Sequence, residues 1–206
     1  MTFVNVAGST GNGTDQISWT KTAVGGGTLA INAVTTHINF DDSVWNDGAG
    51  EDALLTFTGT SDAGVGNLTT SGGNFTQAGL HGTFKFTNLA GTVTYLAGSF
   101  SDYWLQGTLG QTGSGNVTSG PGTANFTSDV VDLSYVTGDS AQFGFTLAHP
   151  AFSVTSGTLN NFKGNSVSGS FGGIAVPEPA TWALMIAGFG GAGAMIRSRR
   201  RQAVAA

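Results

Sequence analysis

Residues 82–87 read GTFKFT, a stretch in which Phe84 and Phe86 alternate with Thr83, Lys85 and Thr87. In an extended strand this alternation puts both phenylalanines on one face and the lysine and threonines on the other. The same pattern recurs in AQFGFTL (141–147), VDLSY (131–135) and SVSGSF (166–171). It is typical of antiparallel strands that bury one face and expose the other to water.

Turn-forming segments separate these alternating stretches, namely GNG (11–13), GGG (25–27), NDGAG (46–50), SGG (71–73) and SGPG (119–122). No sustained helical period occurs between residues 2 and 170, so the pattern argues against alternating strands and helices around a parallel sheet. Many short strands with glycine-rich turns indicate a sandwich or a barrel. We predict an all-β fold, an antiparallel β-sandwich of the jelly-roll type.

The distribution of charge separates the body of the chain from its end. Residues 1–176 contain three lysines and eleven aspartates and glutamates, a net charge of −8, whereas four arginines lie within residues 197–201. An acidic body with so few lysines has no electrostatic footprint for nucleic acid, so we expect no nucleic-acid partner. The absence of cysteine excludes disulfides, thiolate metal sites and a cysteine nucleophile.

One acidic cluster is a candidate for calcium binding, because dense carboxylate oxygens are the ligands that calcium prefers. It comprises Asp41, Asp42, Asp47, Glu51 and Asp52. The spacing does not match an EF-hand loop, and a solvated acidic loop fits the same residues. We therefore expect no resident metal or other cofactor.

No local pattern indicates an enzyme. The three histidines, His37, His81 and His149, are far apart and have no metal-ligand partner nearby in sequence, and no GxSxG nucleophile motif occurs. A pair of glycosidase carboxylates cannot be identified among the acids. We expect the protein not to be an enzyme.

The stretch SDYWLQG (101–107) is the best candidate for a sugar-binding surface. Adjacent side chains in a strand point to opposite faces, so Tyr103 and Trp104 are predicted to divide between the core and the surface. A core residue beside an incidental surface aromatic is the simpler explanation of the pattern, and we prefer it to a binding face.

The chain ends with VPEPATWALMIAGFGGAGAMIRSRRR, residues 176–201. The uncharged run from Ala180 to Ile196 would form a helix of roughly 25 Å, at the short end of what crosses a bilayer. An all-β body offers no obvious partner for a buried helix, so the run is predicted to be a transmembrane helix. Arginines directly after such a run hold that end in the cytoplasm, which leaves residues 1–176 outside the inner membrane.

This segment resembles the PEP-CTERM sorting signal, in its PEPxxWA subtype. The matching motif residues are Pro177, Glu178, Pro179, Trp182 and Ala183, followed by the apolar run and the membrane-stop cluster Arg197, Arg199, Arg200 and Arg201. The resemblance implies an exported protein of a Gram-negative bacterium that makes exopolysaccharide. It also implies recognition by exosortase, a membrane-embedded cysteine enzyme that cleaves at or near the motif.

These observations divide the chain into an extracytoplasmic all-β domain (1–173), the sorting signal (174–201) and a short tail (202–206). We expect a protein anchored in the inner membrane with its body in the periplasm, then released to the cell surface or medium. Such signals normally accompany an N-terminal signal peptide, and residues 1–13 do not resemble one, so we expect a missing upstream segment.

Two classes of function remain open for the β body. The first is a structural or adhesive protein of the envelope or extracellular matrix, associated with exopolysaccharide or a biofilm. The second is a secreted carbohydrate-binding module or a polysaccharide-active enzyme delivered by the same signal.

Overall fold

The structure, a computed structural model, describes residues 2–7, 15–41, 48–64, 66–133, 136–146, 148–175, 184–191 and 195. The strands are β1 (Thr2–Ala7), β2 (Ile17–Ala23), β3 (Gly26–Phe40), β4 (Glu51–Ser61), β5 (Leu68–Ser71), β6 (Asn74–Asn88), β7 (Thr94–Thr108), β8 (Gly115–Thr118), β9 (Ala124–Thr127), β10 (Val136–Phe145), β11 (Val154–Thr155), β12 (Thr158–Leu159), β13 (Phe162–Gly164) and β14 (Val167–Ala175).

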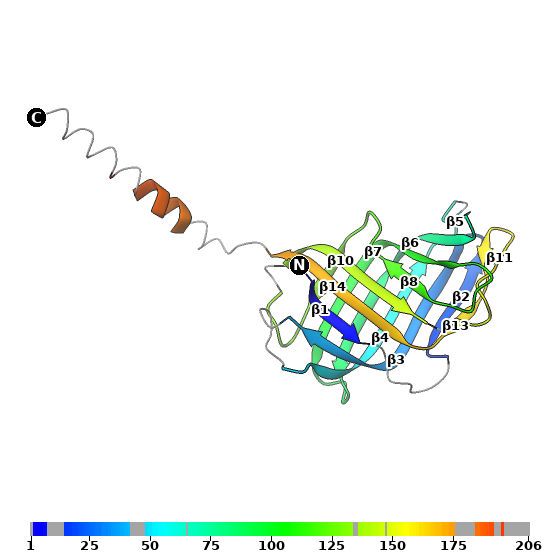
Figure 1. Cartoon of the computed structure of the whole chain (residues 1–206), viewed down its shortest axis with the longest axis horizontal. Helices are drawn as coiled ribbons and strands as arrows, with labels where there is room; N and C mark the ends of the chain where they lie inside the picture. Colours follow the sequence, from blue (N-terminus) through cyan, green and yellow to red (C-terminus); the bar gives the residue numbers. More distant parts are fainter. Residues whose placement is uncertain are drawn as a thin grey trace, which may run out of the picture.

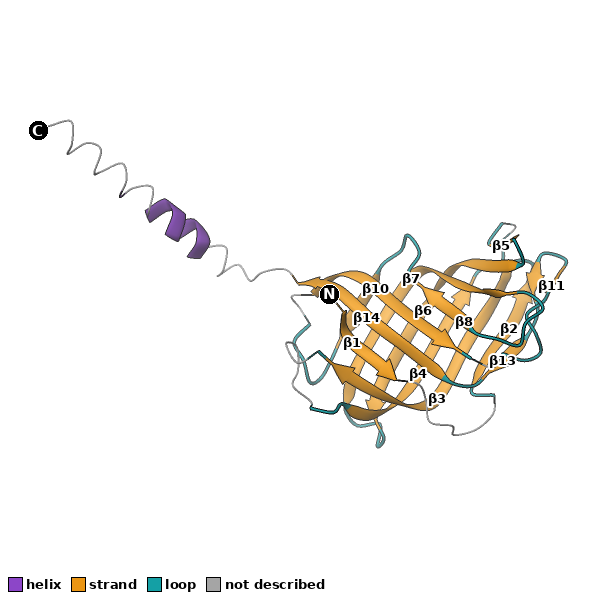
Figure 2. Ribbon diagram, viewed as in Figure 1, coloured by secondary structure: helices purple, strands orange, loops and turns teal. Residues whose placement is uncertain are grey.

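The strands wrap around a common interior, as Figures 1 and 2 show, because β1 pairs along both of its edges. One edge of β1 contacts β14 and the other contacts β3. The hydrogen-bonded path β1–β14–β10–β8–β7–β6–β4–β3 therefore returns to β1, and every pair along it is antiparallel. The result is a closed, barrel-like sheet.

At several places in the barrel, two short strands pair one after the other with the same edge of a longer strand. β1 and β2 follow each other along one edge of β3, and β8 and β9 follow each other along one edge of β7. β14 and β13 continue the same arrangement beside β1 and β2. The described connections, residues 119–123 between β8 and β9 and residues 165–166 between β13 and β14, are short loops that keep the chain at the same place in the barrel.

The prediction of an all-β, antiparallel fold is confirmed, but the predicted architecture, a sandwich of the jelly-roll type, is wrong. A jelly roll requires connections that cross between two sheets, whereas here the long strands β3, β4, β6 and β7 pair with one another in chain order. β3, β6 and β7 each contain 15 residues, and twisted strands of this length tilt enough for a sheet to close on itself.

Each of these 15-residue strands contains one irregularity that reverses the alternation of its side chains. Ala33 in β3, Gly79 in β6 and Asp102 in β7 have positive φ angles of 50°, 70° and 55°. Such bulges bend a strand and increase its twist, which favours closure of the barrel. The buried positions change parity across each one, from Ile31 to Val34, from Gln77 to Leu80 and from Phe100 to Tyr103.

Phenylalanine rings fill one end of the barrel interior. Phe171 on β14 lies 4.9 Å from Phe84 and 5.0 Å from Phe143, measured between ring centroids, and Phe57 lies 5.2 Å from Phe143. All four rings are buried, as the alternation in GTFKFT, AQFGFTL and SVSGSF predicts for Phe84, Phe143 and Phe171. Offset and edge-to-face ring pairs at these distances stabilise a core beyond the area they bury.

A second aromatic cluster fills the other end of the interior. Phe162 on β13 lies 4.8 Å from Phe152 and 5.6 Å from Phe145. Trp19 is buried beside them and donates a hydrogen bond from its indole N–H to the Leu159 carbonyl oxygen, 3.2 Å away. The buried nitrogen is therefore satisfied, which a buried polar group requires.

The predicted strand VDLSY does not form as expected. Residues 131–133 lie in an irregular segment between β9 and β10, although Leu133 is buried, and residues 134–135 lie outside the described residues. An apolar side chain can be buried from a loop as well as from a strand, so alternation over three residues did not identify a strand here.

The chain enters and leaves the barrel at the same end, since Thr2 pairs with Gly172. Beyond β14, residues 184–191 and Met195 are helical. Among the described residues, no helix combines the length and the apolar character that crossing a membrane requires. The run predicted to span the membrane, Ala180–Ile196, is described only in part.

Truncating Phe171 tests how far the barrel depends on its aromatic interior. We expect Phe171→Ala to lower the free energy of unfolding by about 3–5 kcal/mol, because it leaves a cavity that the surrounding rings cannot fill. Urea unfolding followed by tyrosine and tryptophan fluorescence measures this change. The control Leu89→Ala, at an exposed position, should change stability by less than about 0.5 kcal/mol. Equal effects of the two substitutions would contradict the prediction.

Candidate functional site

The structure describes the end of β14, from which the C-terminal tail leaves the barrel, but it does not describe the residues of the sorting motif. Pro177, Glu178, Pro179, Trp182 and Ala183, and the cluster Arg197, Arg199, Arg200 and Arg201, lie outside the described residues. β14 ends at Ala175, which pairs with Val136 at the end of the barrel where Thr2 enters. The motif therefore begins two residues after the last paired residue of the barrel.

The described helical part of the tail presents apolar side chains to solvent. Leu184, Met185, Ile186, Phe189 and Met195 are between 52% and 75% exposed. Single exposed apolar side chains are common on proteins, but a run of them within twelve residues is not. The barrel leaves these side chains uncovered.

The acidic cluster proposed for calcium is exposed where it is described. Asp41, Glu51 and Asp52 are exposed, and the Asp52 Oδ1 atom lies 3.2 Å from Nδ1 of His37. Asp42 and Asp47 lie outside the described residues. Within the described ranges, no group of three histidine, aspartate or glutamate side chains converges as a metal site.

The three histidines have separate surroundings. His37 contacts Asp52 and lies 2.7 Å from the Ala49 carbonyl oxygen through Nε2, whereas His81 contacts the Gly79 carbonyl oxygen. His149 contacts Asp15. The structure therefore brings each histidine to a different place on the surface.

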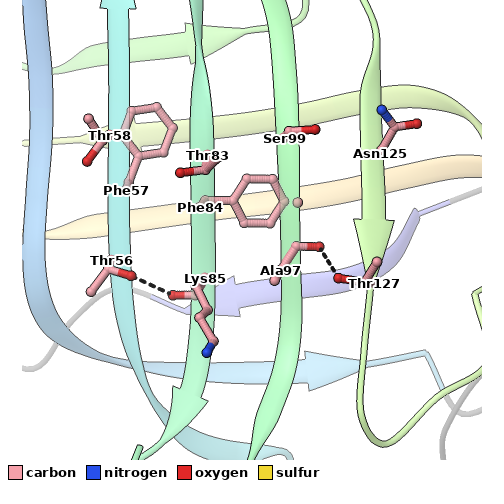
Figure 3. A pocket seen from close by; sticks show the side chains of 11 residues that line it. Thr56, Phe57, Thr58, Thr83, Phe84, Lys85, Ala97, Ser99, Asn125 and Thr127 are labelled. Atoms are coloured by element: carbon pink, nitrogen blue, oxygen red, sulfur yellow. Dashed lines mark hydrogen bonds between the residues drawn. The ribbon is translucent and has the colours of Figure 1, made fainter.

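An open groove of about 520 Å³ crosses the outside of β4, β6, β7 and β9. Figure 3 shows two rows of outward-facing side chains across these strands. The rows follow the strand register and consist of Thr56, Lys85, Ala97 and Thr127, and of Thr58, Thr83, Ser99 and Asn125. Every residue of the second row and the two threonines of the first carry a hydroxyl or amide group, and Lys85 is the charged residue among the described residues of the lining.

The floor of the groove depends on a glycine. Phe57 and Phe84 line the bottom, and each is 2% exposed. A Cβ atom at Gly98 would collide with the Asn125 carbonyl oxygen and would come within 2.8 Å of the Phe84 ring. Glycine at this position lets β9 lie close to β7 above the ring.

Tyr103 and Trp104 divide between core and surface, as the sequence predicts. Tyr103 is 1% exposed and Trp104 is 37% exposed. The Tyr103 hydroxyl oxygen accepts a hydrogen bond from the backbone N–H of Ala141, 3.3 Å away. Ala141 directly precedes Gln142, the first residue of β10 that pairs with β8. This bond holds Tyr103 inside the barrel and thereby fixes Trp104 on the outer face.

A cluster of four charged or polar residues joins distant parts of the chain. The Asp15 carboxylate lies 2.8 Å from Nζ of Lys163 and 2.7 Å from Nε2 of His149, and the backbone N–H of Asp15 donates to Oδ1 of Asn165. Hydrogen bonding to Lys163 and to His149 lowers the pKa of the Asp15 carboxyl group despite some desolvation. The cluster ties the start of β2 to β13 and to the segment after β10.

The sequence did not reveal the groove or the Asp15 cluster. Asp15 is 134 residues from His149 and 148 from Lys163, so no local spacing connects them. The groove has a partial signal, because outward threonines alternate with buried residues in β4. Which strands lie side by side, however, is decided by the closure of the sheet.

A family model for the PEP-CTERM protein-sorting motif matches residues 175–201. No curated protein and no solved structure matches the chain. The match confirms the resemblance of the tail and identifies the chain as an exported protein that carries a sorting signal for exosortase, directed to the cell surface or beyond. The match covers only the tail.

The Asp15 cluster predicts a specific dependence of stability on pH. The contacts in the folded state lower the pKa of the Asp15 carboxyl group below its ordinary value of 3.8. The unfolded chain therefore binds more protons in that range, and the folded state gains stability as the pH rises. We expect the difference in unfolding free energy between wild type and Asp15→Asn to be fully present above pH ~4. It should diminish as the pH falls through the lowered pKa.

Urea midpoints of both proteins between pH 2 and 7 measure this difference. Asp62→Asn, on the exposed connection after β4, changes the formal charge equally and serves as the matched control. The same pH dependence in both variants would show that the Asp15 contacts do not stabilise the fold.

Proposed function

We propose that this protein is a structural or adhesive component of the bacterial envelope or extracellular matrix, delivered by its C-terminal segment and processed by exosortase. The observation that carries the proposal is the sorting motif at residues 175–201. Within it, Pro-Glu-Pro, an apolar run and an arginine cluster follow one another in the order that such processing requires.

The apolar run from Ala180 to Ile196 would hold the chain in the inner membrane before processing. The exposed apolar side chains of residues 184–191 support this step, because hydrocarbon is the environment that stabilises them. Arginines are costly to translocate, so Arg197 and its neighbours would remain cytoplasmic while the barrel faces the periplasm. Trp182 suits the interface between membrane and water.

The position of the motif also supports cleavage that leaves the barrel intact. The last paired residue of β14 is Ala175, and Pro177 follows two residues later. Proline fixes its own φ angle, lacks a backbone N–H and disfavours helix in the residue before it. Two prolines flanking Glu178 would therefore keep the segment extended and accessible to a protease.

The surface of the barrel favours a structural or adhesive role over catalysis. The groove is lined mainly by threonine, serine and asparagine. The described carboxylates with a lowered pKa, Asp15 and Asp129, are held by separate partners, Lys163 and His149 for Asp15 and Thr94 for Asp129. An enzyme that uses paired carboxylates would need two carboxyl groups facing one substrate, one of them with a raised pKa so that it can act as the general acid.

Mass spectrometry of the mature C-terminus tests the proposal. We expect the protein isolated from a host with exosortase to end near residues 177–179, and the protein from an exosortase-deficient strain to retain residues up to 206. Pro177→Ala combined with Pro179→Ala should leave the full tail in place. A full tail in the exosortase-containing host would contradict the proposal.

The arginine cluster makes a separate prediction about topology. Replacing Arg197, Arg199, Arg200 and Arg201 by serine should reduce the periplasmic fraction of an N-terminal reporter fusion, because positive charge no longer holds the C-terminal end in the cytoplasm. Replacement by lysine preserves the charge and should preserve the topology. Identical reporter activity in the serine and lysine variants would refute the assigned orientation.

A further inference from the structure

The outer face of β7 combines the groove with a solvent-exposed indole. Trp104 is the one aromatic side chain among the large apolar side chains exposed on the described part of the barrel, and the others, Val24 and Leu89, are aliphatic. Ser99, in the groove, and Trp104 lie on the same strand, five residues apart. At ~3.3 Å per residue the two are separated by roughly 15 Å.

Side chains with both donor and acceptor groups surround the indole. Trp104 pairs with Thr118 on β8, and Thr118 pairs with Gln142 on β10, so all three point outward in one row. Beside this row, Gln106 donates to Oγ1 of Thr76 at 3.3 Å and accepts from Oγ1 of Thr118 at 3.5 Å. These contacts orient the Gln106 amide, whose geometry suits hydrogen bonding to neighbouring hydroxyl groups.

The indole of Trp104 is partly covered, since the residue is 37% exposed. A Cβ atom at Gly120 would come within 2.9 Å of the Trp104 Nε1 atom, so the segment after β8 contacts one edge of the ring. On the opposite side of the strand, the Tyr103 hydroxyl anchors the backbone through Ala141. A ring that is already ordered loses little conformational entropy when a ligand stacks on it.

The charge of this face selects among possible ligands. From the groove to the Trp104 row, the charged side chains are Lys85 and Asp102, one of each sign. The body as a whole has a net charge of −8, which repels polyanions. A protein partner would need an apolar centre to its interface, and the exposed apolar residues of the barrel are scattered.

We propose that the outer face of β7, from the groove to Trp104, binds a linear, uncharged polysaccharide. Hydroxyl groups of the polymer would bond to the threonine, serine and amide side chains, while the apolar face of one sugar ring stacks on the indole. This inference rests on the proposed function, because a matrix protein outside the cell meets such polymers. It assigns the adhesive contact to one face of the barrel.

Affinity electrophoresis of the purified full-length chain tests the inference. The gels contain dextran, laminarin or galactomannan as neutral polymers, or alginate as an anionic one. We expect at least one neutral polymer to retard the wild type, with alginate having no effect. Trp104→Ala should weaken that retardation at least tenfold in apparent Kd, whereas Trp104→Phe should retain most of it.

Two further variants test whether the polymer binds at this face or elsewhere on the surface. Ser99→Glu places a negative charge in the groove and should weaken binding, while Leu89→Ala, at an exposed position outside the groove and the Trp104 row, should bind as wild type. Unchanged far-UV circular dichroism and urea midpoints establish that each variant folds.

Three results would overturn the inference: no retardation by any neutral polymer, retardation by alginate alone, or equal binding by wild type and Trp104→Ala. Binding to purified protein does not require exosortase. A chain that binds but keeps its tail in the exosortase-containing host would therefore overturn the processing proposal alone.

Discussion

The pairing of β1 with both β14 and β3 is the interaction on which the rest of the structure depends. It joins the first strand of the chain to the last and converts an open meander into a closed sheet. Closure removes the exposed edges that an open sheet of this length would present, and such edges promote aggregation. It also encloses a single interior, which the phenylalanines then fill.

The aromatic interior explains the composition of the rest of the body. Large rings on β4, β6, β10 and β14 occupy the interior, so the alternate positions on the same strands face water and need only be polar. Here they are mainly threonine, serine and asparagine, which suit exposed strands without adding charge. The same alternation thus produces both the core and the hydroxyl-rich outer face that we propose to be adhesive.

The tail and the barrel carry out separate tasks. The tail directs export and sorting through a short linear pattern, and its match to the sorting motif does not depend on how the barrel folds. The barrel carries the surface that we propose to contact extracellular polymers. Thr2 and Ala175 lie at the end of the barrel where β10 begins, and the pair formed by Phe145 and Gly115 lies at the end where β10 finishes.

The sequence by itself determined the features that depend on residues close together in the chain. Alternation identified the strands around Phe84 and Phe143, adjacent residues in one strand separated Tyr103 from Trp104, and the order of Pro-Glu-Pro, apolar run and arginines identified the sorting signal. The tertiary structure alone decided that the sheet closes into a barrel, that β4, β6, β7 and β9 share a groove, and that Asp15 meets Lys163 and His149. The physical reason is that closure of the sheet depends on the order, bulges and twist of all its strands together. The spacing of residues within one strand does not indicate which other strand pairs with it.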